Sequence, residues 1–430
     1  MNSKHIVAIC TLLILSSCNS DKKQVTNSKD YNNYLELAEN KNLQNAESNR
    51  EFWTKKLVNN PTQLPYLGNI ASSYSHLFAA TGDIAYLKEA EKNLIQAHEY
   101  YNYQNLGSLM GLASNYISQH KFKEALMLLT KAELLGDHLS DIQKMIFDVQ
   151  MELGNYDMAK VYLEKLENMN DFDYLIRLSK WSDHYGNLDA TIKYLEKAQT
   201  IAESSKKDDI MYWTYTNLAD FYGHAGRVEE SYKLYLKALN INPDDAYSKK
   251  GIAWIAYSYE NNPDEALRIL NTVTETYHSP DYFLLKAQIY EYKSDTAEKE
   301  AQLKLYKEAV KNPSYGDMYN MYNVILYNHE NENLDEAIAI AKIEVENRPT
   351  PTSYDLLAWS YFNNGNLAEA LKIVKTHIID HTSHPLALLH CAVILKAGGE
   401  TEKANEIKNK LEENNLYELG PVATKDVNRI

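Results

Sequence analysis

The chain has 430 residues, of which 44% are hydrophobic and 24% are charged, a balance that excludes an intrinsically disordered protein. Its formal net charge of −15 disfavours nucleic acid and anionic membrane surfaces as partners, because binding to either depends on Lys and Arg. With only 15 Gly and 10 Pro, tight turns are few, which favours helices over short strands.

The amino-terminal residues have the pattern of an export signal. Lys4 precedes an apolar run from Ile6 to Leu15, which is shorter than the roughly 20 helical residues that span a bilayer. The run ends in Leu15-Ser16-Ser17-Cys18, which resembles the lipobox of bacterial lipoproteins. The resemblance implies that residues 1–17 are a signal peptide and that Cys18 is acylated. The alternative is an ordinary signal peptide that contains a cysteine.

This pattern predicts a lipid-anchored protein of the bacterial cell envelope, favouring the outer membrane and leaving open the periplasmic or surface face. The next segment, residues 18–30, is polar and predicts a flexible tether. Residues 31–62 have a helical pattern that includes Tyr34, Phe52 and Trp53, and we expect them to form an amino-terminal cap on the remaining, folded part of the chain.

A repeated pattern fills most of the remaining chain. In residues 212–243, apolar and small residues recur at steps of three and four on both sides of Gly226, which predicts two amphipathic helices joined by a turn. The pattern returns in residues 351–384 and again from Pro385. Ala219, Ala358 and Ala392 hold equivalent places, and the last two are 34 residues apart, a spacing typical of helical repeats.

The spacing resembles that of the tetratricopeptide repeat family, whose units are helix–turn–helix pairs with small and aromatic residues at fixed offsets. About ten copies fit within residues 63–415, the weakest near 140, 280 and 318. The resemblance implies an all-α fold in which the hairpins stack into a superhelix. The small residues would let helices cross closely, and many of the 34 tyrosines would fill the gaps. Residues 416–430 are predicted to form a tail or a partial cap.

Motifs that would indicate an enzyme are missing. The sequence has no Gly-rich phosphate loop, no H-E-x-x-H, no G-x-S-x-G and no C-x-x-C, so we expect no catalysis, no cofactor and no metal. His377 and His381 could share a helix face as metal ligands do, but surface histidines at a helix end are the favoured interpretation. Cys391 would occupy a core position.

The family resemblance also implies a concave groove, lined by the first helix of each repeat, that holds a peptide or a protein. By register, the groove residues would be Trp213, Asp220, Tyr259, Tyr292, Tyr319, Tyr322, Trp359 and Phe362. Rigid aromatic side chains on a concave surface are typical of binding hot spots, although each of these could instead be a packing residue. The predicted function is a scaffold or adaptor for other proteins. The alternative is a lipoprotein that captures a nutrient or glycan for an outer-membrane transporter.

Overall fold

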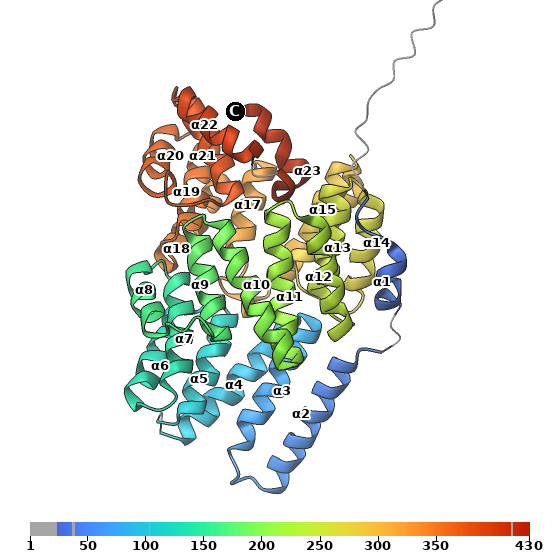
Figure 1. Ribbon diagram of the computed structural model, residues 1–430, viewed down its shortest axis with the longest axis vertical. Helices are drawn as coiled ribbons and strands as arrows, with labels where there is room; N and C mark the ends of the chain where they lie inside the picture. The colour runs from blue at the N-terminus through green and yellow to red at the C-terminus, as the bar shows by residue number, and fades with distance from the viewer. Residues whose placement is uncertain (1–23, 37–38, 103, 414–415) are drawn as a thin grey trace, which may run out of the picture.

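A computed structural model describes residues 24–36, 39–102, 104–413 and 416–430; the predicted signal peptide and Cys18 lie outside these ranges. Within them the fold is all-α, and ten antiparallel hairpins follow one another along the chain (Figure 1). The hairpins are α3 (Tyr66–Thr81) with α4 (Ile84–Tyr100), α5 (Leu106–Ser118) with α6 (Phe122–Leu135), α7 (Leu139–Glu152) with α8 (Tyr156–Lys165), α9 (Phe172–His184) with α10 (Leu188–Ser205), α11 (Asp208–His224) with α12 (Val228–Ile241), α13 (Ala246–Trp254) with α14 (Pro263–Thr274), α15 (Asp281–Tyr292) with α16 (Thr296–Ala309), α17 (Asn320–Glu330) with α18 (Leu334–Asn347), α19 (Pro351–Asn363) with α20 (Leu367–Ile373), and α21 (Pro385–Ala397) with α22 (Thr401–Glu413).

Shorter elements complete the described chain. The π-helical turns η1 (Ile255–Tyr259) and η3 (Val374–Ile378) extend α13 and α20, and the short 3₁₀ helix η2 (Pro313–Tyr315) precedes α17. Outside the hairpins lie α1 (Ser28–Leu35), α2 (Lys41–Asn59), η4 (Leu416–Leu419), α23 (Gly420–Ala423) and η5 (Thr424–Arg429).

The small residues of the repeat lie where the sequence places them. Ala113, Ala219, Ala358 and Ala392 are all fully buried between helices, where a larger side chain would force the helices apart. Gly226 has a φ of 70°, the left-handed conformation expected between α11 and α12. These observations confirm the predicted all-α superhelix of about ten hairpins, including the hairpins near residues 140, 280 and 318.

The superhelix coils tightly enough for its second turn to touch its first. The backbone N–H of His278 donates to the carbonyl oxygen of Thr81 at 2.7 Å, and Lys123 Nζ donates to the carbonyl oxygen of Glu346 at 3.0 Å. Gly154 lies directly against Pro349. Segments about 200 residues apart therefore stack on one another, and the molecule closes around its own axis.

The segment from residue 24 to residue 35 is not the free tether that was predicted as far as residue 30. It packs across the outer helices α12 and α14, where the backbone N–H of Val25 and the hydroxyl of Thr26 donate to the Glu260 carboxylate at 2.7 and 2.8 Å. Tyr31 is 2% exposed and its hydroxyl donates to Glu265 at 2.6 Å. Of the amino-terminal cap predicted for residues 31–62, α2 packs on α3 of the first hairpin, whereas α1 packs on α12 and α14.

The residues after α22 form a compact unit, which we call the C-terminal segment (residues 416–430). Its elements contact α11, η1, α15 and α21, so it lies within the superhelix and is neither a free tail nor a cap on the last hairpin alone. Tyr417, Leu419, Val427 and Ile430 are all less than 10% exposed. The segment is built largely from 3₁₀ turns, and its apolar residues therefore lack the helical period by which the hairpins were predicted.

The contact between turns can be tested with two glycines that share a backbone conformation. Gly154 and Gly365 have φ of +69° and +80°, but a Cβ on Gly154 would lie 2.8 Å from the Pro349 carbonyl oxygen, whereas one on Gly365 would meet nothing within 4 Å. Alanine at either position costs roughly 1–2 kcal/mol of left-handed strain. We expect Gly154→Ala to lower the urea midpoint of unfolding clearly further than Gly365→Ala, and equal effects would contradict the contact.

Candidate functional site

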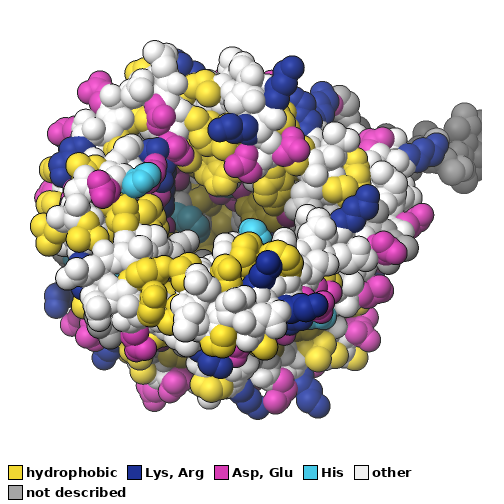
Figure 2. Space-filling model, turned by 90° about the horizontal axis from the view of Figure 1, so that it is seen from below, with side chains coloured by type: hydrophobic (Ala, Val, Ile, Leu, Met, Phe, Trp, Pro, Cys, Tyr) yellow, Lys and Arg dark blue, Asp and Glu magenta, His cyan; other side chains and the backbone are white. Residues whose placement is uncertain are grey.

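The interior of the superhelix contains a cavity of about 800 Å³. Its wall is formed mainly by the first helices of consecutive hairpins, α11, α13, α15, α17, α19 and α21, together with the C-terminal segment. Seen from below, the molecule is hollow at its centre, with hydrophobic and histidine side chains on the inner walls (Figure 2). The cavity therefore lies on the concave side, where the family resemblance places a groove.

Five of the eight predicted groove residues lie at this cavity or beside the C-terminal segment. Asp220, Tyr322 and Trp359 line the cavity directly. The ring of Tyr259 meets that of Tyr417 edge-on at 6.4 Å, and Tyr292 lies 6.0 Å from the ammonium group of Lys425. The predicted face of α11, α17 and α19 is therefore the inner one.

The other three predicted residues do not line the cavity. Tyr319 precedes the first turn of α17 and is 8% exposed, packed against the rings of Tyr306 and Tyr315. Trp213 packs edge-on against Phe172 at 6.1 Å, and Phe362 stacks on Trp359. For Tyr319 and Phe362 the structure supports the packing interpretation, because a shift of a few positions along a helix turns a side chain from the groove toward a neighbouring hairpin. Trp213 is 36% exposed and lies neither in the core nor at the cavity.

Two tyrosines that were not among the predicted groove residues bind Asp220. The hydroxyl groups of Tyr235 and Tyr247 each donate to one oxygen of its carboxylate, the second at 2.6 Å. Burial raises the pKa of Asp220, although both hydrogen bonds oppose that effect. Tyr247 stands one turn before Lys250, whose ammonium group pairs with Asp281 at 3.1 Å. The first-helix register of residues 246–254 would have predicted both Tyr247 and Lys250.

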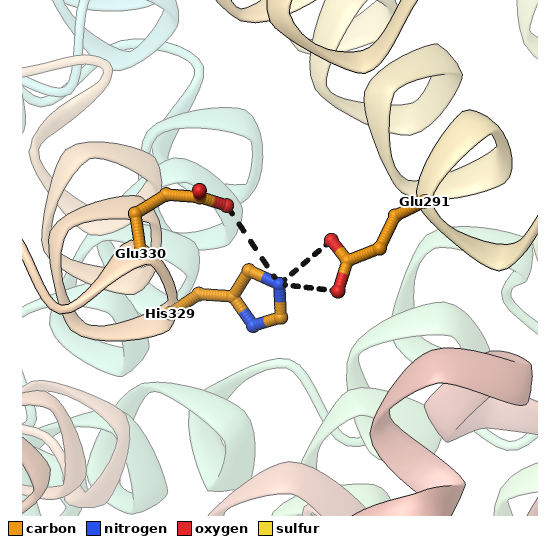
Figure 3. A group of neighbouring side chains, drawn as sticks. All are labelled: Glu291, His329 and Glu330. Atoms are coloured by element: carbon orange, nitrogen blue, oxygen red, sulfur yellow. Dashed lines mark hydrogen bonds and ion pairs between the residues drawn. The ribbon is translucent and has the colours of Figure 1, made fainter. Parts of the chain in front are cut away.

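A group of charged side chains lies on α15, α16 and α17 (Figure 3). His329 Nε2 lies 2.8 Å from one oxygen of Glu291 and 3.8 Å from Glu330, which follows it on α17. Lys299 Nζ lies 3.2 Å from Glu291 and 2.7 Å from Glu330. The hydrogen bond from His329 and the ammonium group of Lys299 lower the pKa of Glu291 to about 2, and Glu291 in turn raises the pKa of His329.

The ligand atoms of Glu291, His329 and Glu330 lie within 4.8 Å of one another, which is close enough for a metal ion. However, the Lys299 ammonium group already bridges the two carboxylates. A divalent ion would have to displace this cation, so the donor set fits an internal network of ion pairs better than a metal site.

A second buried pair lies on the neighbouring first helices α19 and α21. His390 Nδ1 lies 3.0 Å from the Asp355 carboxylate, and its ring stacks on Trp359 with the ring centres 4.1 Å apart. Such a pair could orient a general base, but the lining of this cavity, as far as the structure describes it, contains no Ser, Thr or Cys that could act as a nucleophile. In this arrangement the pair holds the Trp359 ring against the wall.

A smaller cavity of about 490 Å³ lies between the two superhelical turns and shares Tyr322, His384, Pro385 and Glu418 with the first. Burial raises the pKa of Asp183 to about 6, and burial together with nearby Asp183 raises that of Glu418 to about 7. Burial also lowers the pKa of His224, which lies 3.7 Å from Glu418, to about 4. Between pH 4 and pH 7 both members of this contact are therefore mostly neutral.

The predicted sharing of a helix face by His377 and His381 is wrong. The helical turn η3 ends at Ile378 and Asp380 has a φ of 61°, so His381 lies beyond the helix. The ring of His377 stacks on Tyr354 at 3.6 Å. Cys391 is fully buried, as predicted, and burial raises the pKa of its thiol to about 12.

A tetratricopeptide repeat family model matches residues 214–245, which cover most of α11 and all of α12. This match and the ten stacked hairpins define the class as an α-helical repeat superhelix that presents a concave inner surface. Residues 214–245 are therefore similar to a tetratricopeptide repeat, and the other described hairpins share the same helix–turn–helix form. Tetratricopeptide repeat proteins are generally scaffolds without enzymatic activity.

The solved structures compared below have low sequence identity to this chain and low TM-scores. A tetratricopeptide repeat protein from Parabacteroides merdae is 18% identical, with 60% of this chain and 98% of that chain covered and a TM-score of 0.35. The tetratricopeptide repeat protein YrrB, described as having an unusual peptide-binding site, is 20% identical, with 46% of this chain and 95% of that chain covered and a TM-score of 0.28. Yeast Tom70 is 12% identical, with 90% of this chain and 95% of that chain covered and a TM-score of 0.37. No curated protein matches the sequence.

The raised pKa of Glu418 predicts how pH affects stability. Its carboxyl keeps its proton up to about pH 7 in the folded chain but loses it near 4.5 when unfolded, so its contribution is complete below pH 4.5 and is lost as the pH rises through 7. We expect thermal unfolding of the wild type to lose more stability between pH 5 and pH 8 than Glu418→Gln does. Replacing the exposed Glu402 by Gln is the control and should leave the pH dependence unchanged. Parallel curves for the wild type and Glu418→Gln would contradict the assignment.

Proposed function

We propose that the mature chain is a membrane-anchored scaffold of the bacterial cell envelope that binds a segment of another protein inside its superhelix. The observation that carries this proposal is the convergence of six first helices on one cavity of about 800 Å³. Solenoids use such concave surfaces for binding, and rigid aromatic side chains at their centre are typical hot spots. Trp254, Tyr322 and Trp359 supply these side chains.

The charges on the cavity wall narrow the choice of partner. Six carboxylates and two lysines line it. Asp220 accepts two tyrosine hydrogen bonds, and each lysine pairs with wall carboxylates. A segment that brings hydrogen-bond donors or a cation meets a complementary surface, whereas an anionic polymer such as nucleic acid meets repulsion.

The envelope location is supported by the sequence of the first 18 residues, in which a positive start, a short apolar run and Leu15-Ser16-Ser17-Cys18 follow in the order of a lipoprotein signal. None of the described helices is both long enough and apolar enough to span a bilayer. Acyl chains on Cys18 would anchor the protein by burying their methylene groups in lipid.

A second candidate function is capture of a nutrient or a glycan. The cavity volume falls within the range of about 300–1,000 Å³ that is usual for small-molecule sites, and the rings of Trp254 and Trp359 line it. Flat aromatic faces beside carboxylates suit a sugar as well as a peptide. The two functions differ in what the purified protein retains.

The scaffold function predicts the loss of specific partners when the cavity wall is changed. Tyr322→Ala combined with Trp359→Ala removes two hot-spot side chains, and we expect at least a tenfold drop in the envelope proteins recovered with the tagged chain. Met127→Ala, at a site 71% exposed, is the control and should recover the wild-type set. If the wild type is retained on a glycan column, and neither the wild type nor Met127→Ala recovers any envelope protein, the second function is favoured instead.

The anchor is tested by two matched cysteine substitutions. In Cys18→Ser the acyl acceptor is lost, so we expect no incorporation of labelled palmitate and release of the chain from the membrane fraction. Cys10→Ser lies within the predicted signal peptide and should leave both properties unchanged. Labelled Cys18→Ser protein in the membrane fraction would refute lipidation at this residue.

A further inference from the structure

The C-terminal segment already occupies part of the concave surface. Its first element, η4, contacts α11, η1 and α21, and α23 contacts α15 and η1. In Figure 1 the segment, drawn in red, lies at the upper end of the superhelix, where α23 is beside α15. Five of its residues, including Glu418, Leu419 and Val422, line the large cavity. The chain therefore supplies its own occupant for the surface that a partner would use.

Tyr417 anchors this occupant. It is 9% exposed, and its ring meets those of Trp254 and Tyr259 edge-on, each at 6.4 Å. Its carbonyl oxygen accepts a hydrogen bond of 2.6 Å from the hydroxyl of Ser258, which lies in the π-helical turn η1. A Cβ on Gly223 of α11 would lie 3.1 Å from the Tyr417 ring, so the pocket for this aromatic side chain is closely fitted.

The next feature is a Gly-Pro pair that turns the segment along the wall. Gly420 has a φ of +70°, and a Cβ there would lie 2.8 Å from the ring of Trp254. Any other residue would be strained in this conformation and would also collide with Trp254. Pro421 follows in the first turn of α23 with a fixed φ. An aromatic residue, a two-residue spacer and Gly-Pro together form the motif that this wall accepts.

Resting on the proposed function, we infer that the C-terminal segment is an internal pseudo-ligand and that the natural partner is a protein segment carrying the same aromatic-x-x-Gly-Pro motif, which displaces it. Because the internal copy is covalently attached, it competes at an effective concentration in the millimolar range. A partner must therefore bind more favourably than the internal copy, or arrive as several linked copies.

The internal copy has one unfavourable feature that a partner can avoid. Glu418, the residue after the anchor, lies beside Asp183 and is only 20% exposed, with His224 as its neighbour at 3.7 Å. Above pH 7 a buried carboxylate near a second acid opposes docking. A partner with an uncharged residue at this position would keep the aromatic anchor and the Gly-Pro turn without this repulsion.

The test uses the full chain and a fluorescent synthetic peptide of residues 416–430. Gly420→Ala in the protein should dislodge the internal copy, so we expect the peptide to bind this variant at least tenfold more tightly than the wild type at pH 8. A peptide with Gln in place of Glu418 should bind the Gly420→Ala variant more tightly than the unmodified peptide does. Adding Trp254→Ala to the variant should abolish binding, because the wall of the anchor pocket is then missing.

Two results would overturn the inference. One is a folded Gly420→Ala variant that fails to bind the peptide. The other is obtained on the unaltered chain: hydrogen exchange in which residues 416–430 open only together with α11 and α21, since a pseudo-ligand must open independently of its wall. If either occurs while Tyr322→Ala with Trp359→Ala still loses envelope partners, the scaffold function stands and only the pseudo-ligand is refuted.

Discussion

The close stacking of helical hairpins through alanine positions is the constraint on which the rest of the structure depends. Ala113, Ala219, Ala358 and Ala392 have no exposed surface, and their small size sets how near consecutive hairpins approach. A repeated small rotation at such contacts accumulates along a solenoid. Here it accumulates until Gly154 touches Pro349, so that a linear array becomes a closed superhelix with an interior.

That interior changes the electrostatics of the groove. In an open solenoid the inner face is wet, but here burial raises the pKa values of Asp183, Asp220 and Glu418. Local partners stabilise the buried carboxylates. Two tyrosine hydroxyls donate to Asp220, and the ammonium group of Lys299 pairs with both Glu291 and Glu330. The cavity is therefore organised by internal hydrogen bonds and ion pairs, and the C-terminal segment completes one of its walls.

The repeats could be predicted because each depends on local pattern: Ala358 and Ala392 recur at the spacing of one hairpin, and Gly226 provides the turn between α11 and α12. The inner face was predicted in part, since Asp220, Tyr322 and Trp359 line the cavity, whereas Tyr319 belongs to the core. Closure could not be predicted, because it sums many small rotations. The docking of Tyr31 and Tyr417 depends on contacts more than 150 residues away and leaves no period in the sequence.

Spin labels on the two superhelical turns give the most direct test of closure. Lys123 in α6 and Glu346 in α18 are both on the surface and touch across the turns, with Nζ of the first 3.0 Å from the carbonyl oxygen of the second. With cysteines at these two positions in an otherwise cysteine-free chain, dipolar electron paramagnetic resonance should give one narrow distribution at the short distance of a direct contact. A broad distribution at long distances would show an open solenoid and contradict the closed interior.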